Sequence, residues 1–169
     1  MKIRSWEILG VVFTIIVGTL LHFTYDWTGQ CALVGLFSAV NESTWEHLKL
    51  LFVPFFIWTI IEYFAFGENK KNFFPAKTIS VIAGMLTIII LFYGYMAIFK
   101  RDIMVLDISI FLIGVIVSYI LSYFIMKSNS LTSDRSVFLG KLFMVLLVIS
   151  FIGFTFTPPN YFLFIDPTL

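Results

Sequence analysis

The decisive stretch of this sequence is Asn41-Glu42-Ser43-Thr44-Trp45-Glu46-His47-Leu48-Lys49, which places four ionisable side chains directly before a long apolar run. Ser43 and Glu46 match the Ser-x-x-Glu capping box, in which the hydroxyl and the carboxylate each accept a backbone N–H at a helix start. The run from Leu50 to Phe66 is nearly all apolar apart from Glu62. We therefore predict a helix that starts here and enters a membrane, with the polar residues at its mouth.

The composition supports a membrane protein and excludes several other classes. The 169 residues are 60% hydrophobic and 12% charged, whereas about a quarter of the residues of a soluble domain are charged. Cys31 is the single cysteine, so neither a disulfide framework within the chain nor a thiolate zinc cluster is possible. A formal charge of +1, without a basic patch that contains aromatic residues, argues against nucleic acid as a partner.

The hydropathy pattern predicts an all-α membrane bundle that forms one transmembrane domain over residues 1–169. We expect its five spanning helices at approximately 6–24, 43–66, 78–99, 103–126 and 137–157. The apolar segment Cys31–Val40 is too short to cross, so it should be re-entrant or interfacial. Pro54 should kink the second helix and free the carbonyl of Leu50. The loop from Gly67 to Lys77 carries several charges and is expected to be aqueous.

The distribution of basic residues predicts the orientation. Five spans place the N-terminus and two loops on one side, and that side carries eight of the eleven Lys and Arg residues. These eight are Lys2, Arg4, Lys70, Lys71, Lys77, Lys127, Arg135 and Lys141. By the positive-inside rule we expect a multi-pass membrane protein with a cytoplasmic N-terminus and an extracytoplasmic C-terminus.

The candidate site lies where the outer ends of the first two helices should meet. Two unlinked stretches bring both histidines and several acids to the same depth, and the short apolar connection keeps them close. His47 and Lys49 oppose the dipole of their own helix, so we expect a negative partner: Glu42, Glu46, another carboxylate or an anionic ligand. The candidate ligand-binding residues are His22, Tyr25, Asp26, Asn41, Glu42, Trp45, Glu46, His47, Lys49 and Asp166.

Several of these motifs also carry a family resemblance. The segments are His22-Phe23-Thr24-Tyr25, Phe37-Ser38, the block Asn41–Lys49, Pro158-Pro159 and Phe164-x-Asp166-Pro167. Together they resemble a family of small multi-pass bacterial membrane proteins classed as a domain of unknown function. The resemblance covers most of the chain. It implies a bacterial plasma membrane, but no activity.

Three functions are compatible with these residues. The first is an outward-facing polar pocket that binds or translocates a small polar or cationic solute or a lipid headgroup. The second is a non-catalytic accessory subunit or assembly factor, whose partner is another membrane protein or a second copy of the chain. The third is a membrane-embedded metal-dependent hydrolase, in which His22 and His47 bind zinc with Glu42, Glu46, Asp26 or Asp166.

The helix geometry makes the hydrolase the weakest of the three. The sequence has no His-Glu-x-x-His motif, and the adjacent Glu46 and His47 should point about 100° apart on a straight helix. We therefore assign no cofactor, no metal site and no catalytic residue from the sequence. The bilayer is the one partner that the composition itself implies.

Overall fold

The computed structural model describes residues 2–166, which form helices joined by loops, with no strand in that range. Five long helices make up the body of the chain: α1 (Ile3–Trp27), α3 (Thr44–Ala65), α4 (Phe73–Phe99), α5 (Met104–Lys127) and α6 (Asp134–Phe156). The short elements are α2 (Ala32–Gly35), η1 (Gly67–Asn69) and η2 (Phe162–Phe164). Pro167 of the resemblance motif lies outside the described residues.

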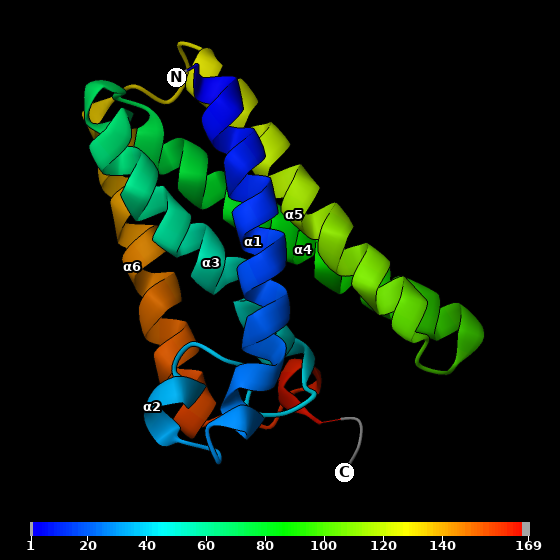
Figure 1. Cartoon of the computed structure of the whole chain (residues 1–169). Helices are drawn as coiled ribbons and strands as arrows, with labels where there is room; N and C mark the ends of the chain where they lie inside the picture. The colour runs from blue at the N-terminus through cyan, green and yellow to red at the C-terminus, as the bar shows by residue number, and fades with distance from the viewer. Residues whose placement is uncertain (1, 167–169) are drawn as a thin grey trace.

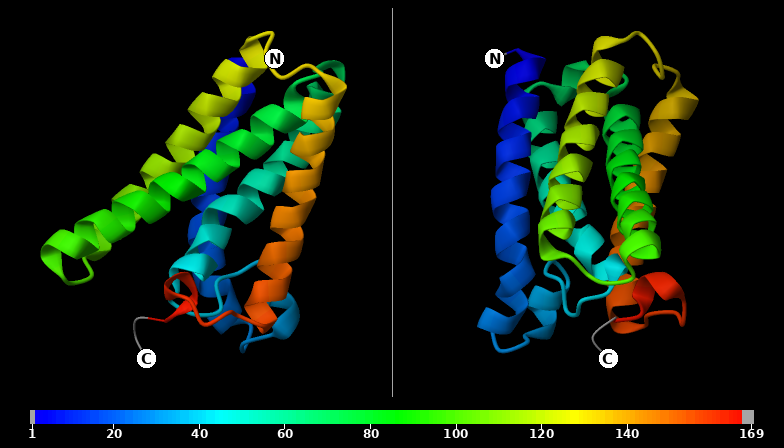
Figure 2. Two further views of the ribbon diagram at one scale, coloured as in Figure 1. Left: turned by 180° about the vertical axis from the view of Figure 1, so that it is seen from behind. Right: turned by 90° about the vertical axis from the view of Figure 1, so that its right-hand side faces the viewer.

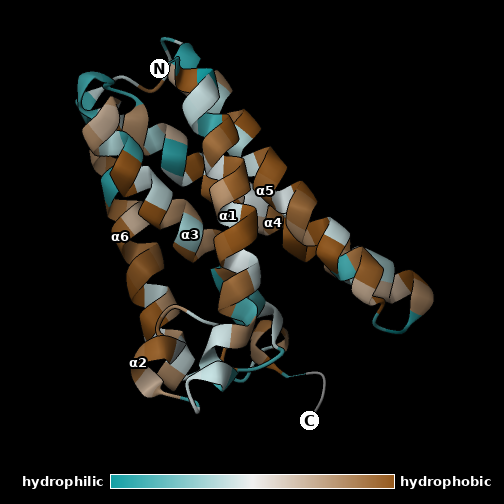
Figure 3. Ribbon diagram, in the orientation of Figure 1, coloured by the Kyte–Doolittle hydropathy of each residue, from teal (hydrophilic) through white to brown (hydrophobic). Residues whose placement is uncertain are grey.

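All five long helices are long and apolar enough to cross a membrane. The shortest, α3, has 22 residues and is therefore ~33 Å long, against a hydrocarbon core of about 30 Å. Apolar residues cover the middle of the helices, and polar residues gather at the two ends of the bundle (Figure 3). This arrangement is consistent with a multi-pass membrane protein and confirms the predicted fold class.

The connection between α1 and α3 is also as predicted. It contains only the four-residue α2 and returns the chain to the end of the bundle from which it left, without crossing (Figure 1). The main departure is at α4, which begins at Phe73, five residues before the predicted start. Lys77 consequently belongs to the helix and is fully buried, so its predicted place in an aqueous loop is wrong.

The helices pack as a bundle from which one hairpin diverges. α1 lies against α3 and α5, while α4 lies against α3, α5 and α6. More of α3 is buried than of any other spanning helix. The α4–α5 hairpin leans away from the other helices toward its turn (Figures 1 and 2). We call the end with the N-terminus the amino end and the end with α2 and η2 the carboxyl end.

The predicted irregularity at Pro54 coincides with the crossing of α1 and α3. Proline has no N–H, so the carbonyl of Leu50 loses its helical donor. A Cβ placed on Gly18 of α1 would lie 2.3 Å from that carbonyl oxygen. The two backbones can approach this closely only because residue 18 is glycine, which is how small residues act at helix crossings in membranes.

Candidate functional site

The start of α3 is fixed by its own polar side chains. Ser43 is the N-cap residue, and its hydroxyl accepts the N–H of Glu46 at 3.4 Å. The second half of the predicted capping box differs, since the N–H of Ser43 is donated to Oδ1 of Asn41 at 3.0 Å. The carboxylate of Glu46 instead accepts the N–H of Val40 at 3.0 Å. Asn41 and Ser43 therefore shape the helix start.

The loop before α3 is tied to the end of α1 by Ser38, a buried residue. Its hydroxyl accepts the N–H of Tyr25 at 3.0 Å and donates to the carbonyl of Leu21. The hydroxyl thus bridges a donor and an acceptor that are four residues apart in one helix. This contact holds the carboxyl end of α1 beside the start of α3, as the sequence predicts.

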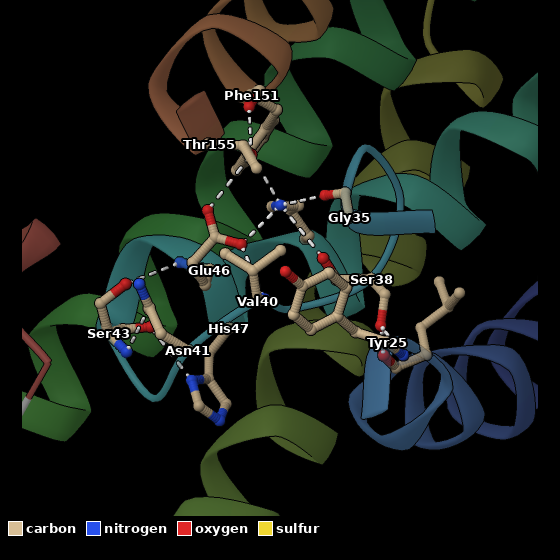
Figure 4. A network of polar contacts seen from close by, with 12 residues as sticks. Tyr25, Gly35, Ser38, Val40, Asn41, Ser43, Glu46, His47, Phe151 and Thr155 are labelled. Atoms are coloured by element: carbon tan, nitrogen blue, oxygen red, sulfur yellow. Dashed lines mark hydrogen bonds and ion pairs between the residues drawn. The ribbon is translucent and has the colours of Figure 1, made fainter. Parts of the chain in front are cut away.

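Glu46 and Lys49 form a buried ion pair at this end (Figure 4). Nζ of Lys49 lies 2.5 Å from Oε2 of Glu46 and also donates to Oγ1 of Thr155 at 2.7 Å. Two backbone carbonyls complete its surroundings, Gly35 at 2.8 Å and Ser38 at 3.1 Å. An ammonium has three protons to donate, so its capacity is fully used. This pair joins α3, the α2 segment and α6.

His47 points away from this pair. Glu46 is directed toward Thr155, whereas the ring of His47 lies on the other side of the helix (Figure 4). The predicted cluster is therefore divided into two groups. The first is the closed Glu46–Lys49 pair. The second consists of His22, Glu42 and His47, and we call it the carboxyl-end triad.

The carboxyl-end triad brings together three potential metal ligands. One ring nitrogen of each histidine and a carboxylate oxygen of Glu42 all lie within 4.8 Å of one another. The two imidazole rings are 5.1 Å apart between centroids. Nδ1 of His22 is buried and has no hydrogen-bond partner among the described residues. The side chain of Glu42 is 51% exposed, so the triad is open to water.

The contacts of His47 define the protonation of its ring. Nδ1 lies 3.0 Å from the carbonyl of Ser43, which can only accept, so we assign a proton to Nδ1. Nε2 lies 3.3 Å from Oε2 of Glu42. Two lone pairs would repel each other here, so either a proton, carried by the ring or by the carboxyl, or a metal ion lies between the two atoms. In the metal-free protein the hydrogen bond from His47 lowers the pKa of Glu42 below its usual value.

Three further predicted residues lie outside the triad. Asp166 accepts the backbone N–H of Glu42 at 3.2 Å, which joins the last described residue to the start of α3. Trp45 stacks on Phe151, with 4.6 Å between ring centroids. Asp26 is exposed at the end of α1. Asp166 therefore supports the backbone of the triad, and Trp45 packs α3 against α6.

A second acidic group occupies the start of α5. The hydroxyl of Tyr95 lies 3.0 Å from a carboxylate oxygen of Asp102 and 2.5 Å from one of Asp107. Hydrogen bonds from Asp107 and then from Tyr95 lower the pKa of Asp102 below its usual value. These contacts link the two helices of the α4–α5 hairpin near its turn.

The amino end contains a buried charge cluster that the sequence analysis did not identify. Nζ of Lys77 lies 2.8 Å from Oε1 of Glu7 and also pairs with Glu62. Oγ of Ser122 donates to the same oxygen of Glu7 at 3.0 Å. These four side chains come from four different helices. Pro75, in the first turn of α4, is a helix-start signal that would have placed Lys77 inside that helix.

The comparison with protein families covers nearly the whole chain. A family of unknown function, DUF6512, matches residues 1–168. The chain belongs to DUF6512. This confirms the resemblance to a family of unknown function. No curated protein matches the chain, and no solved structure matches it. The DUF6512 family carries no assigned activity, so the function has to be argued from the geometry of its sites.

Proposed function

We propose that this chain is a membrane protein that binds a divalent transition-metal ion at its carboxyl end through His22, Glu42 and His47. The proposal specifies the small cationic solute that the sequence analysis left open. The carrying observation is that two imidazole nitrogens and a carboxylate oxygen lie within 4.8 Å of one another, because one metal ion can satisfy all three atoms at once.

The hydrogen bond behind His47 is of the kind found at metal sites. A histidine that binds a metal usually donates its other ring N–H to a carbonyl or carboxylate, which fixes the tautomer. His47 has this arrangement through the carbonyl of Ser43. His22 supplies a second imidazole whose Nδ1 lacks a hydrogen-bond partner in the described structure.

The spacing and ligand types favour Zn²⁺ as the test ion. Ligand atoms around tetrahedral zinc are about 3.3 Å apart, given Zn–N distances of about 2.0–2.1 Å. The ligand atoms of the triad now lie within 4.8 Å of one another, so small side-chain rotations would bring them to the spacing of zinc ligands. Two imidazoles and a carboxylate leave one position for water, and imidazole also suits copper and nickel.

The exposure of Glu42 and the orientation of the chain together suggest from which side of the membrane a metal ion would reach the site. Without the buried Lys77, seven of the eleven basic residues are exposed at the amino end, against Lys100 and Arg101 at the carboxyl end. The positive-inside rule therefore still favours a cytoplasmic amino end. The half-exposed Glu42 would then face the outside of the cell and bind metal ions from there. The membrane would be the plasma membrane that the family resemblance implies.

Binding is better supported than hydrolysis. A zinc hydrolase needs a group that can act as a general base beside the metal-bound water. Glu46, the acid next to His47 in sequence, is instead buried against Lys49. No specific observation favours the accessory role, which remains a hypothesis from the sequence.

Zinc titration of the purified, chelator-treated chain tests the proposal. We expect one Zn²⁺ per chain, with the affinity reduced at least tenfold in each of His22→Gln, Glu42→Gln and His47→Gln, since even outer-shell partners contribute about 10–100-fold. Glu68→Gln is the control, because it removes an exposed acid at the opposite end of the bundle and should leave the affinity unchanged.

Two results would contradict metal binding. One is zinc uptake no greater than that of a mock preparation. The other is equal affinity in the wild type and in all three ligand variants. Either result would leave His47 and Glu42 as an ordinary ion pair. Monodispersity and unfolding temperature, measured for each variant, separate loss of binding from loss of fold.

A further inference from the structure

We propose that the amino-end cluster of Glu7, Glu62 and Lys77 is a proton-binding site that exchanges its proton with water at the amino end of the bundle. This inference concerns a different site from the carboxyl-end triad and does not depend on metal binding.

The charge of the cluster is unbalanced. Two carboxylates share a single ammonium, and the exposed fractions are 4% for Glu7 and 0% for both Glu62 and Lys77. With all three groups ionised the cluster would carry one uncompensated negative charge. Burying such a charge is very unfavourable, and two carboxylates in one site do not ionise together readily. A proton on one carboxyl removes the excess charge.

Among residues 2–166, no other charged side chain is paired with this cluster. α5 contributes the phenol of Tyr119, whose oxygen is engaged at 2.7 Å with Thr14. The remaining cation nearby, Arg4 on α1, is exposed. α3 and α4 contribute only Glu62 and Lys77 themselves. The position of the second positive charge is therefore left for a proton.

The hydrogen bonding of the carboxylates is also incomplete. Oε2 of Glu7 and Oε1 of Glu62 are buried and have no hydrogen-bond partner within the described residues. An ionised carboxylate can accept about four hydrogen bonds, so these oxygens are poorly solvated for a fully charged pair. Lys49 is equally buried, yet all of its donors are used. Burial alone therefore does not explain why oxygens of Glu7 and Glu62 lack hydrogen-bond partners.

A groove connects the cluster to the surface. A cavity of about 360 Å³ lies between α1 and α5, lined by Arg4, Glu7, Tyr119 and Tyr123 together with apolar residues. It is far larger than the ~30 Å³ share of one water molecule. Glu7 forms part of its wall, and Arg4 lies one helical turn nearer the amino end. The proposed proton path therefore runs along this groove from the amino end to Glu7.

Infrared difference spectroscopy of the full chain in detergent tests the proposal. The wild type should show the carbonyl stretch of a protonated carboxylic acid that weakens as the pH is raised and shifts in D₂O. Glu7→Gln and Glu62→Gln should each abolish the band, because the remaining carboxylate then balances Lys77. Glu68→Gln is the control, since Glu68 is an exposed acid at the same end, and it should retain the band.

Three outcomes would overturn the proposal. The first is the absence of a protonated-acid band from the wild type. The second is a band that responds neither to pH nor to D₂O, which would show a sealed structural contact. The third is displacement of the band by Na⁺ at constant pH, which would show that the cluster holds a metal cation. Monodisperse elution and an unfolding temperature close to that of the wild type would show that Glu62→Gln is folded, whichever result the spectra give.

Discussion

Lys49 and Lys77 are both fully buried in the bundle, yet their surroundings differ. Lys49 has one carboxylate partner, two carbonyls and a hydroxyl, so charge and hydrogen bonding are both complete. Lys77 has two carboxylate partners, of which each keeps an oxygen without a hydrogen bond in the described structure. The surroundings of Lys49 are those of a structural ion pair that holds helices together. The surroundings of Lys77 can accept one more cation, such as a proton.

This difference separates structural from functional charges inside a membrane. An intramembrane ionisable residue is a candidate functional residue by default. The Glu46–Lys49 pair shows that a neutral, saturated group can instead hold three segments together. The amino-end cluster differs in its net charge, because two carboxylates and one ammonium need one more positive charge to be neutral. The two lysines therefore give the clearest tests.

Lys49→Met should give the largest effect. The substitution leaves Glu46 buried without its cation, and breaking a buried pair in this way costs about 3–5 kcal/mol. Thermal or denaturant unfolding in detergent measures the loss. The double variant Lys49→Met/Glu46→Gln should recover much of it, because the unpaired charge is then absent. Equal stability of Lys49→Met and the wild type would mean that the pair has no structural role.

Gly18→Ala should have an intermediate effect and tests the crossing that both ends share. The new methyl group would meet the carbonyl oxygen of Leu50 at 2.3 Å, and such overpacking typically costs about 1–3 kcal/mol. Gly94→Ala is the control, because a Cβ there meets nothing within 4 Å. Since alanine also favours helix, Gly94→Ala should be neutral or more stable. Similar losses in both variants would contradict a specific role for Gly18.

Glu62→Gln should have the smallest effect on stability, less than about 1 kcal/mol, because one carboxylate still balances Lys77 and a like charge is removed. Glu46→Gln provides the matched comparison at the other end, where Lys49 loses the one carboxylate partner that it has among residues 2–166. We expect the Glu46 variant to be clearly less stable in the same unfolding assay. The reverse order would refute the distinction between the two buried lysines.

The sequence was sufficient for the fold and for part of the site. Long apolar runs predict the five spanning helices, and the Ser43 cap predicts the start of α3. The dipole argument predicts negative partners for His47 and Lys49, which the structure supplies as Glu42 and Glu46. These features depend on residues that are close in sequence, and for this reason local patterns reveal them.

The amino-end cluster could not be found in this way. Glu7 and Lys77 are 70 residues apart, and each lies among basic residues that are typical of a membrane flank. Their pairing depends on how α1 and α4 pack, which no local pattern encodes. The division of the carboxyl-end residues into two groups has a similar cause. It depends on the placement of Thr155 from α6 beside Glu46.

The close contact between Gly18 and Leu50 divides α1 into two arms of unequal length. His22 lies four residues from Gly18 along the helix and Glu7 lies eleven residues away in the other direction, so the two arms are ~6 Å and ~16 Å long. If α1 rocks about this point, Glu7 travels nearly three times as far as His22. A small tilt that leaves the two imidazoles together can therefore separate Glu7 from Lys77.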